Sequence, residues 1–363
     1  MGSDSMNRIM AVLAAVVCVV SVTCTFVIAS FGSDDRSGSI DSVIFDMYEE
    51  EGIVHFYFYE DYLFDRYLDE SSTSLHELGE FLADNVTVGR VPVLTDIVCC
   101  SAYTVQKDTE DGYYAGRNFD YRYSEPAIVH TSPDGGYESV SIVDMVMFDD
   151  TSETMTEREQ DTVFNALPYL PLDGVNEKGV FVCVNVVHNA DPFLQDDPGK
   201  STIFITSAIR LILDNAATTQ EAVDLIMDYN LHSNINYHLL ICDSSGDSRA
   251  IEVVDNRTYA TSTDVMTNHY ITDEGADVEV SESSGDRYAI LRGALDADDT
   301  MSEDEVKSVL ISVQQSNSDR IHYTRWSVIY DLETLDCVVW MVTPFDEDAE
   351  LDYDTPYRFS VFS

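Results

Sequence analysis

A thiol, a guanidinium and a carboxylate lie close together in one predicted hairpin. Cys100 begins the first strand, and the second strand ends with Arg117, Asn118 and Asp120. The open ends of an antiparallel pair lie side by side, so these side chains should meet in space. An arginine beside a cysteine favours the thiolate, which is the nucleophilic form, and a carboxylate can hold an amine in place. From the spacing alone, a buried Arg117–Asp120 pair that only stabilises the hairpin is the alternative.

Hydrophobic periodicity predicts the elements that must position this hairpin. Strands are predicted over residues 54–62, 101–107, 112–121, 139–148, 179–187, 237–242, 250–254, 326–332 and 337–342. Helices are predicted over residues 74–85, 207–216, 219–229, 284–295 and 302–313. A run of strands, then helices, then strands again indicates an α+β layered fold and not βαβ winding.

The hairpin resembles the nucleophile segment of the choloylglycine hydrolase family. That family contains bile salt hydrolases and penicillin V acylases and is related to acid ceramidase and N-acylethanolamine acid amidase. Its pattern is a cysteine at the chain start, followed by a hairpin ending in Gly-Arg-Asn-hydrophobic-Asp, which residues 116–120 (GRNFD) fit fully. The step from Cys100 to Arg117 is one residue longer than in the family, and the turn near residues 109–111 can hold the extra residue at little cost.

Three later segments match the same family in the expected order. They are DGVNEKG at 173–179, followed by VFVCVNVV with Asn185; VMTN at 265–268, with Asn268; and SSGDRY at 283–288, with Arg287. The closing YTRWSVIYDLETLDCVVW resembles the last strands of the family, so the similarity spans residues 48–345. Each motif is short, but their order together with the cysteine makes the combination specific.

The resemblance implies an N-terminal nucleophile hydrolase with a four-layer αββα core. Cys100 would be the nucleophile, and its own α-amine the general base, because α-amines have a pKa of about 7.7–8.0. Asp120 would orient that amine, and Arg117 would favour the thiolate.

The resemblance also implies the groups that stabilise charge during the reaction. The side-chain N–H of Asn268, together with Asn185, would donate to the tetrahedral oxyanion, where one such donor is worth about 2.7–4 kcal/mol. Arg287 would brace the surroundings of the cysteine. No metal and no organic cofactor is required by this mechanism.

The mechanism requires Cys100 to become the first residue of a chain. We therefore expect the protein to cut its own Cys99–Cys100 bond, as family members with a pro-segment do. The expected organisation is a signal peptide or membrane anchor at 1–31, a pro-segment at 32–99 that is retained as a small subunit, and a catalytic domain at 100–363. Cys99 is the alternative nucleophile, but the spacing and the small hydroxyl residue Ser101 favour Cys100.

The N-terminal segment predicts export. An uncharged run of 23 residues, Ile9 to Phe31, follows Arg8 and precedes Asp34 and Asp35. It is long enough to span a bilayer, and the flanking charges leave the N-terminus inside. Ala29 could stand before a signal-peptidase cut, so a cleaved signal and a retained anchor both stay open. The expected location is extracellular, either secreted or anchored to the outer face of the membrane.

The charge of the chain excludes some classes of partner. The 363 residues carry 67 Asp and Glu against 19 Lys and Arg, a formal charge of −48. A nonspecific nucleic-acid binder needs a basic face, and anionic lipid headgroups also attract basic segments, so neither is expected as a partner. Any membrane contact is then expected only through the N-terminal hydrophobic segment. Salt screens such self-repulsion, so life in salt or outside the cell is one interpretation, and lineage composition is the other.

The function predicted from these residues is hydrolysis of a linear amide C–N bond in a small N-acyl substrate, through an acyl-enzyme on Cys100. Conjugated bile salts, penicillin V-like amides and N-acyl amino acids stay open as substrates. A lipid amidase similar to acid ceramidase or N-acylethanolamine amidase is one alternative. An inactive surface binding protein on the same scaffold and an acyltransferase are the others. Relatives often form homo-oligomers, which is an expectation by analogy only.

Overall fold

The computed structural model describes residues 39–40, 42–87, 89, 99–109, 111–121, 124–148, 162–315, 323–342 and 351–362. The leader predicted over residues 1–31 lies outside these ranges, as do residues 90–98 before the predicted cut. Within the described ranges, no helix is long and apolar enough to cross a membrane.

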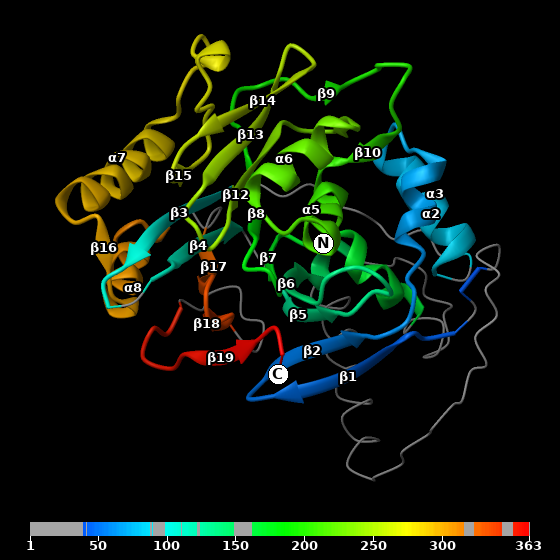
Figure 1. Cartoon of the computed structure of the whole chain (residues 1–363), viewed down its shortest axis with the longest axis horizontal. Coiled ribbons are helices and arrows are strands. Elements are labelled where there is room, and N and C mark those ends of the chain that lie inside the picture. Colours follow the sequence, from blue (N-terminus) through cyan, green and yellow to red (C-terminus); the bar gives the residue numbers. More distant parts are fainter. Residues whose placement is uncertain are drawn as a thin grey trace, which may run out of the picture.

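Two large sheets lie face to face and form the centre of the molecule (Figure 1). The nine-stranded sheet has the order β1-β2-β5-β6-β7-β8-β12-β13-β14, with β1 Phe45–Glu50, β2 Ile53–Phe58, β5 Pro126–Thr131, β6 Ser139–Asp144, β7 Asp173–Asn176, β8 Phe181–Val186, β12 Tyr237–Cys242, β13 Ser248–Val254 and β14 Arg257–Ser262. The seven-stranded sheet has the order β15-β3-β4-β17-β18-β19, and β16 also pairs with β3; its strands are β3 Cys99–Lys107, β4 Tyr113–Tyr121, β15 Val265–Met266, β16 Thr300–Met301, β17 Tyr323–Asp331, β18 Asp336–Met341 and β19 Tyr357–Ser360.

Helices cover the outer face of each sheet. Helices α5 (Ile205–Asn215) and α6 (Thr219–Met227) pack on β7, β8, β12 and β13 of the nine-stranded sheet. Strand β8 contacts β3 of the other sheet, whose outer face carries α7 (Glu282–Ala297) and α8 (Glu303–Ser312). The order helix, sheet, sheet, helix confirms the α+β class and the four layers predicted from the sequence.

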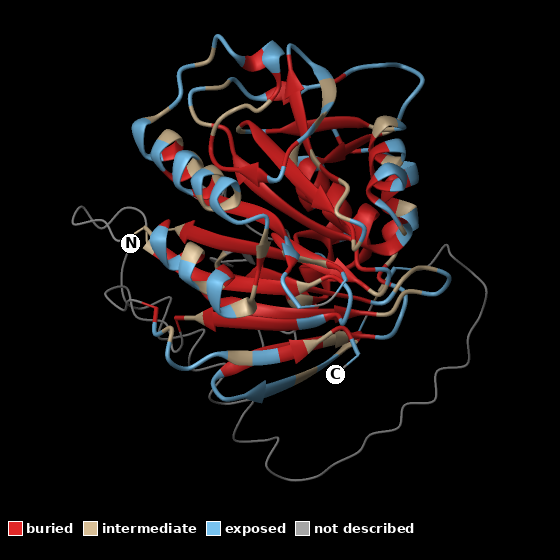
Figure 2. Cartoon of the chain, turned by 60° about the vertical axis from the view of Figure 1, so that its left-hand side comes forward, coloured by how far each residue is buried: buried red, intermediate tan, exposed pale blue. Residues whose placement is uncertain are grey.

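The layering explains the sequence of the central strands. Strands β6, β8 and β12 are buried along their whole length because each is covered on both faces. They therefore read as continuous apolar runs instead of alternating ones. Figure 2 shows these strands as buried, whereas the helices are buried only on their inner sides and β1 is largely exposed.

Several element boundaries differ from the sequence prediction. The strand predicted over 54–62 ends at Phe58, and the one predicted over 139–148 ends at Asp144, where a 3-10 helix, Met145–Phe148, begins. Asp144 accepts hydrogen bonds from the backbone N–H groups of Glu125 and Val146, and this local bonding turns the chain out of the sheet. The sequence analysis missed β1, β5, β14, β19 and α2 (Phe64–Glu70).

Residues between 39 and 87, from the predicted pro-segment, are built into the molecule. The β1–β2 hairpin extends the nine-stranded sheet, since β2 pairs in parallel with β5. Helix α2 and helix α3 (Leu75–Asn85) follow, and Ser74, predicted as the first residue of the helix, is the N-cap of α3. The Tyr62 hydroxyl donates to Asp214 at 2.7 Å, and the Tyr67 hydroxyl accepts from the backbone N–H of Phe204 at 3.1 Å.

The remaining elements are small. A third sheet has the order β10-β11-β9, and two further 3-10 helices are described; their bounds are β9 Phe193–Leu194, β10 Thr202–Phe204, β11 Asn230–Ser233, Phe164–Tyr169 and Asp273–Gly275. Cys183, Cys242 and Cys337 lie buried and unpaired in β8, β12 and β18. They pack as small apolar strand residues.

Candidate active site

The predicted hairpin forms, and its open end brings the predicted residues together. Strands β3 and β4 pair antiparallel, with Cys100 opposite Phe119 and Cys99 opposite Asp120. The described residues on either side of the turn at 108–112 place the two strands as the sequence predicted. The hairpin lies in the interior of the seven-stranded sheet, between β15 and β17.

The two faces of the hairpin carry different groups. Cys100 and Arg117 point into the interface between the two sheets, where Arg117 contacts main-chain carbonyls of the nine-stranded sheet. Asn118 points to the opposite face, toward α8. Its amide donates to the carbonyl of Leu310 at 2.9 Å, and its oxygen accepts from Ser327. Asn118 therefore ties β4 to α8 and β17, whereas Cys100 lies on the face of the hairpin that meets the nine-stranded sheet.

Arg117 binds the thiol of Cys100. Its Nη2 lies 3.2 Å from Cys100 Sγ and 2.8 Å from the carbonyl of Val184. Its Nη1 donates to the carbonyl of Leu172 at 2.6 Å and to the carboxylate of Asp173. The guanidinium is completely buried, and the nearby Asp173 and Cys100 hold its pKa above the ordinary value although burial acts the other way.

Asp173 is a site residue that the sequence analysis did not identify. It lies on β7, is completely buried, and also accepts hydrogen bonds from Trp326 Nε1 at 3.3 Å and from the Tyr330 hydroxyl. Burial raises its pKa, whereas Arg117 and these donors lower it. A buried arginine needs a counterion, so the aspartate at the start of the DGVNEKG motif (173–179) was the available signal, although the strand β7 that carries it was not predicted.

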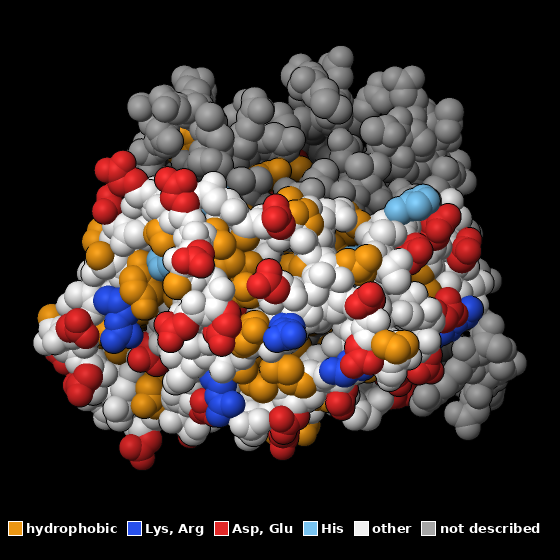
Figure 3. All heavy atoms as spheres, turned by 90° about the horizontal axis from the view of Figure 1, so that it is seen from above, with side chains coloured by type: hydrophobic (Ala, Val, Ile, Leu, Met, Phe, Trp, Pro, Cys, Tyr) orange, Lys and Arg blue, Asp and Glu red, His pale blue; other side chains and the backbone are white. Residues whose placement is uncertain are grey.

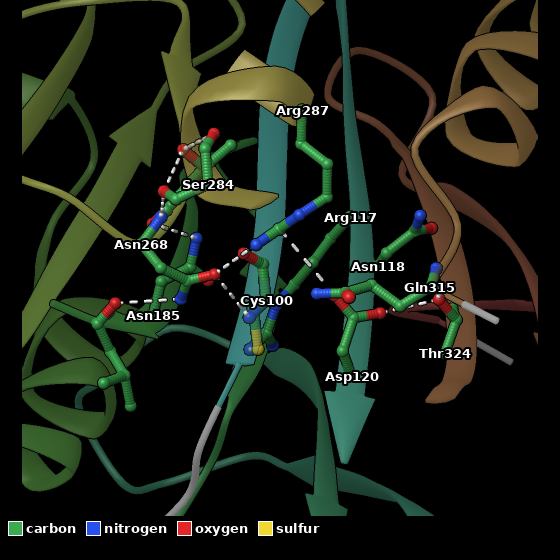
Figure 4. Close-up of polar contacts among 12 residues, drawn as sticks. Cys100, Arg117, Asn118, Asp120, Asn185, Asn268, Ser284, Arg287, Gln315 and Thr324 are labelled. Atoms are coloured by element: carbon green, nitrogen blue, oxygen red, sulfur yellow. Dashed lines mark hydrogen bonds and ion pairs between the residues drawn. The ribbon is translucent and has the colours of Figure 1, made fainter. Parts of the chain in front are cut away.

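A second set of groups holds the backbone of Cys100 (Figure 4). Asn268 Oδ1 accepts from the backbone N–H of Cys100 at 3.4 Å, and Arg287 Nη1 donates to the carbonyl of Cys100 at 2.9 Å. Arg287 Nη2 also donates to Asn268 Oδ1 at 2.6 Å. Arg287 reaches in from α7, so three segments far apart in sequence meet at one residue.

The two predicted oxyanion donors lie beside Cys100, but their amides are engaged with main-chain carbonyls in the uncut chain. Asn268 Nδ2 donates to the carbonyl of Val186 at 2.8 Å. Asn185 Nδ2 lies 3.3 Å from the carbonyl of Thr267 and 3.4 Å from that of Met266. An amide nitrogen has two hydrogens, so Asn268 keeps one for a further acceptor, whereas Asn185 must release one of its two carbonyls before it can donate elsewhere. Their oxyanion role remains a prediction.

Asp120 lies on the outer side of the hairpin. Its Oδ1 accepts from the Thr324 hydroxyl at 2.6 Å, and Arg287 Nη1 lies 3.8 Å from its Oδ2 (Figure 4). Burial raises the pKa of this carboxyl, while Arg287, Thr324 and Gln315 lower it. Oδ2 is buried without a hydrogen-bond partner, so it is the acceptor available to an amine at residue 100.

Burial dominates the electrostatics of the thiol. Cys100 is completely buried, and this raises its pKa above the ordinary value although the charge of Arg117 lowers it. The predicted effect of Arg117 has the expected direction, but desolvation outweighs it in the uncut chain. Neighbouring Cys183, on β8, has its pKa raised to about 12 by burial. Neither cysteine is a thiolate at neutral pH in this state.

The segment that carries Asn268 is fastened to α7. The Ser284 hydroxyl accepts from the backbone N–H of Asn268 at 2.8 Å and bonds the Thr267 hydroxyl at 3.0 Å and His269 Nδ1 at 2.8 Å. Ser284 was quoted in the SSGDRY motif without a role. Its position in the first turn of α7 explains how one helix fixes both Asn268 and Arg287.

Two further residues of the matching motifs, Trp326 and Asn176, have structural roles. Trp326 is completely buried and stacks on Phe119 with ring centroids 3.8 Å apart. Asn176 accepts from the backbone N–H groups of Lys178 and Val180 and so forms the turn before β8. Among the described residues, no group of three His, Cys, Asp or Glu side chains is placed to hold a metal ion.

Comparison with known proteins gives one family-model match and several structural neighbours. The model described as acyl-coenzyme A:6-aminopenicillanic acid acyl-transferase matches residues 170–337. No curated protein matches the chain. Among solved structures, penicillin V acylase from Agrobacterium tumefaciens is 19% identical over 72% of this chain and 86% of its own, with a TM-score of 0.50. A variant of conjugated bile acid hydrolase from Clostridium perfringens is 13% identical over 72% of this chain and 97% of its own, with a TM-score of 0.51.

These matches agree with the resemblance seen in the sequence. The structural neighbours share the fold of this chain, and the family model supports an enzyme. The matched region holds Asp173, Asn185, Asn268 and Arg287 but not the hairpin with Cys100. The evidence for a role of Cys100 and Arg117 therefore comes from the geometry described above and not from the family model.

Proposed function

From the N-terminal nucleophile hydrolase fold and the acyltransferase-model match, we propose that this protein is a cysteine amidohydrolase that acts on linear N-acyl amides. The observation that carries the proposal is the double contact of Cys100: its Sγ with Arg117, and its nitrogen with Asn268. A thiol and a future α-amine on one residue, each with a charged or polar partner, supply nucleophile and base together.

The first step of the proposal is maturation. Cys100 Sγ attacks the carbonyl carbon of Cys99, a thioester forms, the Cys99–Cys100 C–N bond breaks, and the nitrogen takes up a proton. Water then hydrolyses the thioester and leaves a carboxylate on Cys99 and a free α-amine on Cys100. Asn268 and Arg287 support this step because they hold the nitrogen and carbonyl of Cys100.

Turnover uses the α-amine so released. It takes the thiol proton, the sulfur attacks the amide carbon of the substrate, and the negative charge collects on the carbonyl oxygen. Asn268 has one amide hydrogen to offer that oxygen, and Asn185 joins it by releasing the carbonyl of Met266 or Thr267. The α-ammonium gives its proton to the leaving amine, a thioester on Cys100 remains, and water releases the acid. Oδ2 of Asp120 holds the α-amine between these steps.

The substrate class follows from the proposed reaction. It is a small molecule with an apolar acyl group joined to an amine, in line with the amide substrates in the names of both structural neighbours. We expect the loops around residues 121–160 and 189–200 to shape the acyl pocket; residues 122–123 and 149–160 of the first loop lie outside the described residues. Bile salts, penicillin V-like amides and N-acyl amino acids are the first candidates.

We propose that the pro-segment, residues 32–99, stays bound after the cut as a small subunit. The support is the parallel pairing of β2 with β5 and the burial of Phe56 and Phe58. Hydrogen bonds cross this junction at Tyr62, which bonds Asp214, and at Tyr67, which bonds Phe204. We also propose that the hydrophobic leader directs export, so that the protein is secreted or anchored to the outer face of the cell membrane.

Acyl transfer is a second candidate function. The matched family model describes an acyltransferase, and an acyl group on Cys100 can be released to an amine as well as to water. The two activities share every step up to the thioester. A lipid amidase and an inactive binding protein also remain candidates.

The deciding experiment is the denatured mass of the purified chain, with Cys100→Ala and Cys337→Ala beside it. We expect the wild type and Cys337→Ala to give a fragment that begins at Cys100, and Cys100→Ala to stay whole. Cys337 is a matched control because it is also a buried strand cysteine. A fragment that begins at Cys99 would move the nucleophile by one residue, and a wild type that stays uncut across pH and salt would overturn the mechanism.

The substrate test follows on matured protein. Penicillin V, a glycine-conjugated bile salt and N-palmitoylethanolamine are offered separately, with and without added hydroxylamine as an amine acceptor. Hydrolysis of either of the first two supports the amidohydrolase, and preference for the third supports the lipid amidase. Acyl hydroxamate as the main product would support acyl transfer, and no product with any of them would favour the binding protein.

A further inference from the structure

A buried histidine and glutamate lie behind the segment that carries Asn268. His238 on β12 and Glu252 on β13 are cross-strand neighbours, and neither side chain is exposed to solvent. His238 Nδ1 lies 2.9 Å from Glu252 Oε1, and His238 Nε2 lies 2.9 Å from the carbonyl oxygen of Thr267. Neither residue takes part in the reaction proposed above.

Together these two side chains hold both ends of one short segment. His238 binds the carbonyl of Thr267, immediately before Asn268. Glu252 accepts from the backbone N–H of Ile271 at 2.8 Å and from that of Thr272 at 2.7 Å. Asn268 therefore lies in a stretch whose beginning and end are fixed from the same strand pair. Its side chain reaches the nitrogen of Cys100 from this stretch.

The hydrogen-bond partners determine where the protons lie. A carbonyl oxygen only accepts, so Nε2 of His238 must carry a hydrogen to bond Thr267. The 2.9 Å contact between Nδ1 and Oε1 of Glu252 needs one more proton, which the two side chains share. The pair therefore forms a closed chain of hydrogen bonds from Glu252 through the His238 ring to the carbonyl of Thr267.

The charged surroundings agree with this arrangement. The titratable groups that face the pair from the fastened segment are His269 and Tyr270, and Arg287 on α7 acts on His269. Burial and the nearby His238 lower the pKa of His269, so it is neutral, and burial raises the pKa of Tyr270 to about 12. On the neighbouring strand β8, the residue opposite His238 is the uncharged Asn185. Glu252 is then the one carboxylate among these groups that directly bonds His238.

We propose that His238 and Glu252 are positioning residues that fix Asn268 against Cys100. The proposal rests on the proposed function, because it assigns their effect to the cut and to turnover on Cys100. Loss of either partner lets the 267–272 segment shift relative to Cys100. A displacement of about 1 Å at a reacting centre can reduce the rate about a hundredfold.

The test compares wild type with His238→Gln and Glu252→Gln, all as full chains. We expect both variants to slow self-cleavage and to lower kcat for penicillin V about ten- to hundredfold, with KM little changed. His232→Gln is the matched control, since His232 is also buried but lies on β11 and binds Ser72. Variants with wild-type cleavage and kcat would overturn the proposal.

A second measurement does not depend on activity or on the variants folding. In matured wild type labelled with 15N-histidine, we expect Nε2 of His238 to carry a hydrogen that is bonded to the carbonyl of Thr267 at pH 7.5. The signal is assigned by its loss in His238→Gln or, if that variant does not fold, by its contact with the labelled Thr267 carbonyl. A His238 ring without a hydrogen on Nε2 would overturn the proposal even if the enzyme is active. A wild type that neither cuts itself nor hydrolyses penicillin V, but keeps this hydrogen bond, would count against the proposed function and leave the His238–Thr267 contact intact.

Discussion

The guanidinium of Arg117 links the thiol of Cys100 to a buried carboxylate by hydrogen bonds. Arg117 has the thiol of Cys100 on one side and the carboxylate of Asp173 on the other, all completely buried. Removing one member of a buried ion pair leaves the other charge uncompensated, which typically costs about 3–5 kcal/mol. Asp173 therefore supports both the stability of the sheet interface and the position of Arg117.

The first prediction concerns this carboxylate. We expect Asp173→Asn to lower the free energy of unfolding by about 3–5 kcal/mol, because Arg117 loses its buried counterion. Turnover should also fall, since Arg117 is then free to move away from Cys100. Urea unfolding and the rate with penicillin V measure the two effects.

The control for this prediction is Asp331→Asn. It breaks the ion pair with Lys107, 2.8 Å long, in which Asp331 is partly exposed. We expect it to reduce stability less and to leave turnover unchanged. Equal losses of stability in the two variants would contradict the special role of Asp173.

At the scale of the element, two histidines join the pro-segment to the catalytic part. His55 on β2 and His130 on β5 stack, with Nδ1 of the first 3.2 Å from Nε2 of the second. Burial lowers the pKa of His55 to about 4 and that of His130 to about 3. Both rings are therefore neutral in the folded protein at pH 7.

The second prediction is an acid-sensitive junction. Below the unfolded pKa of 6.5 the separated chains bind protons before the folded protein does, so stability is lost as the pH falls from 6.5 toward 4 and 3. Asp144 and Asp214 act in the opposite sense, because their pKa is raised to about 6 and the folded protein protonates them first. The histidine contribution must therefore be read from a variant.

The measurement is the midpoint of thermal unfolding and the release of the pro-segment at pH 7.5, 5.5 and 4.5. We expect the double variant His55→Asn, His130→Asn to lose less stability than wild type over this range. His76→Asn is the control, because His76 is exposed on α3. Parallel pH curves for wild type and the double variant would refute the prediction.

The sequence predicted elements well where periodicity was strong and poorly where pairing decides. Helices α3, α5, α6, α7 and α8 were predicted within a few residues. Strand β5 (PAIVHT) was missed because its apolar run is only three residues long, Ala127 to Val129, and lies between Pro126 and His130. Its parallel pairing with β2 joins segments about seventy residues apart, which no local pattern encodes.

Much of the site could be predicted from the sequence, because its residues lie in short motifs that follow one another in a fixed order. Cys100, Arg117, Asp120, Asn185, Asn268 and Arg287 were all named from the sequence, and the structure brings them together around β3. Asp173, Ser284, His238 and Glu252 act through hydrogen bonds across strands and segments, so their roles needed coordinates. Which way each asparagine amide points also lies beyond any sequence pattern.

At the scale of the whole molecule, acidic side chains dominate the surface. Figure 3 shows Asp and Glu spread over the visible face, with few Lys and Arg between them. The formal charge is −48. Such charges repel one another in the folded chain, and at 1 M salt the screening length falls to about 3 Å.

The third prediction is that salt stabilises this protein. We expect the unfolding midpoint and the recovery after refolding to rise between 0.1 and 2 M potassium chloride, because screening weakens the repulsion. Equal concentrations of sucrose serve as the control for general cosolvent effects. A midpoint that does not change with salt would leave lineage composition as the explanation of the acidic surface.

The position of β2 at the side of β5 has a practical consequence for making this protein. A synthetic gene that starts at Cys100 would skip the cut, yet it would produce a chain whose β5 lacks its parallel neighbour. The N–H and C=O groups on that side of β5 would then lack hydrogen-bond partners and could pair with strands of other copies, which leads to aggregation. A laboratory that wants the proposed catalyst should therefore express the whole precursor, because β2 of the pro-segment and β5 of the catalytic part complete one sheet together.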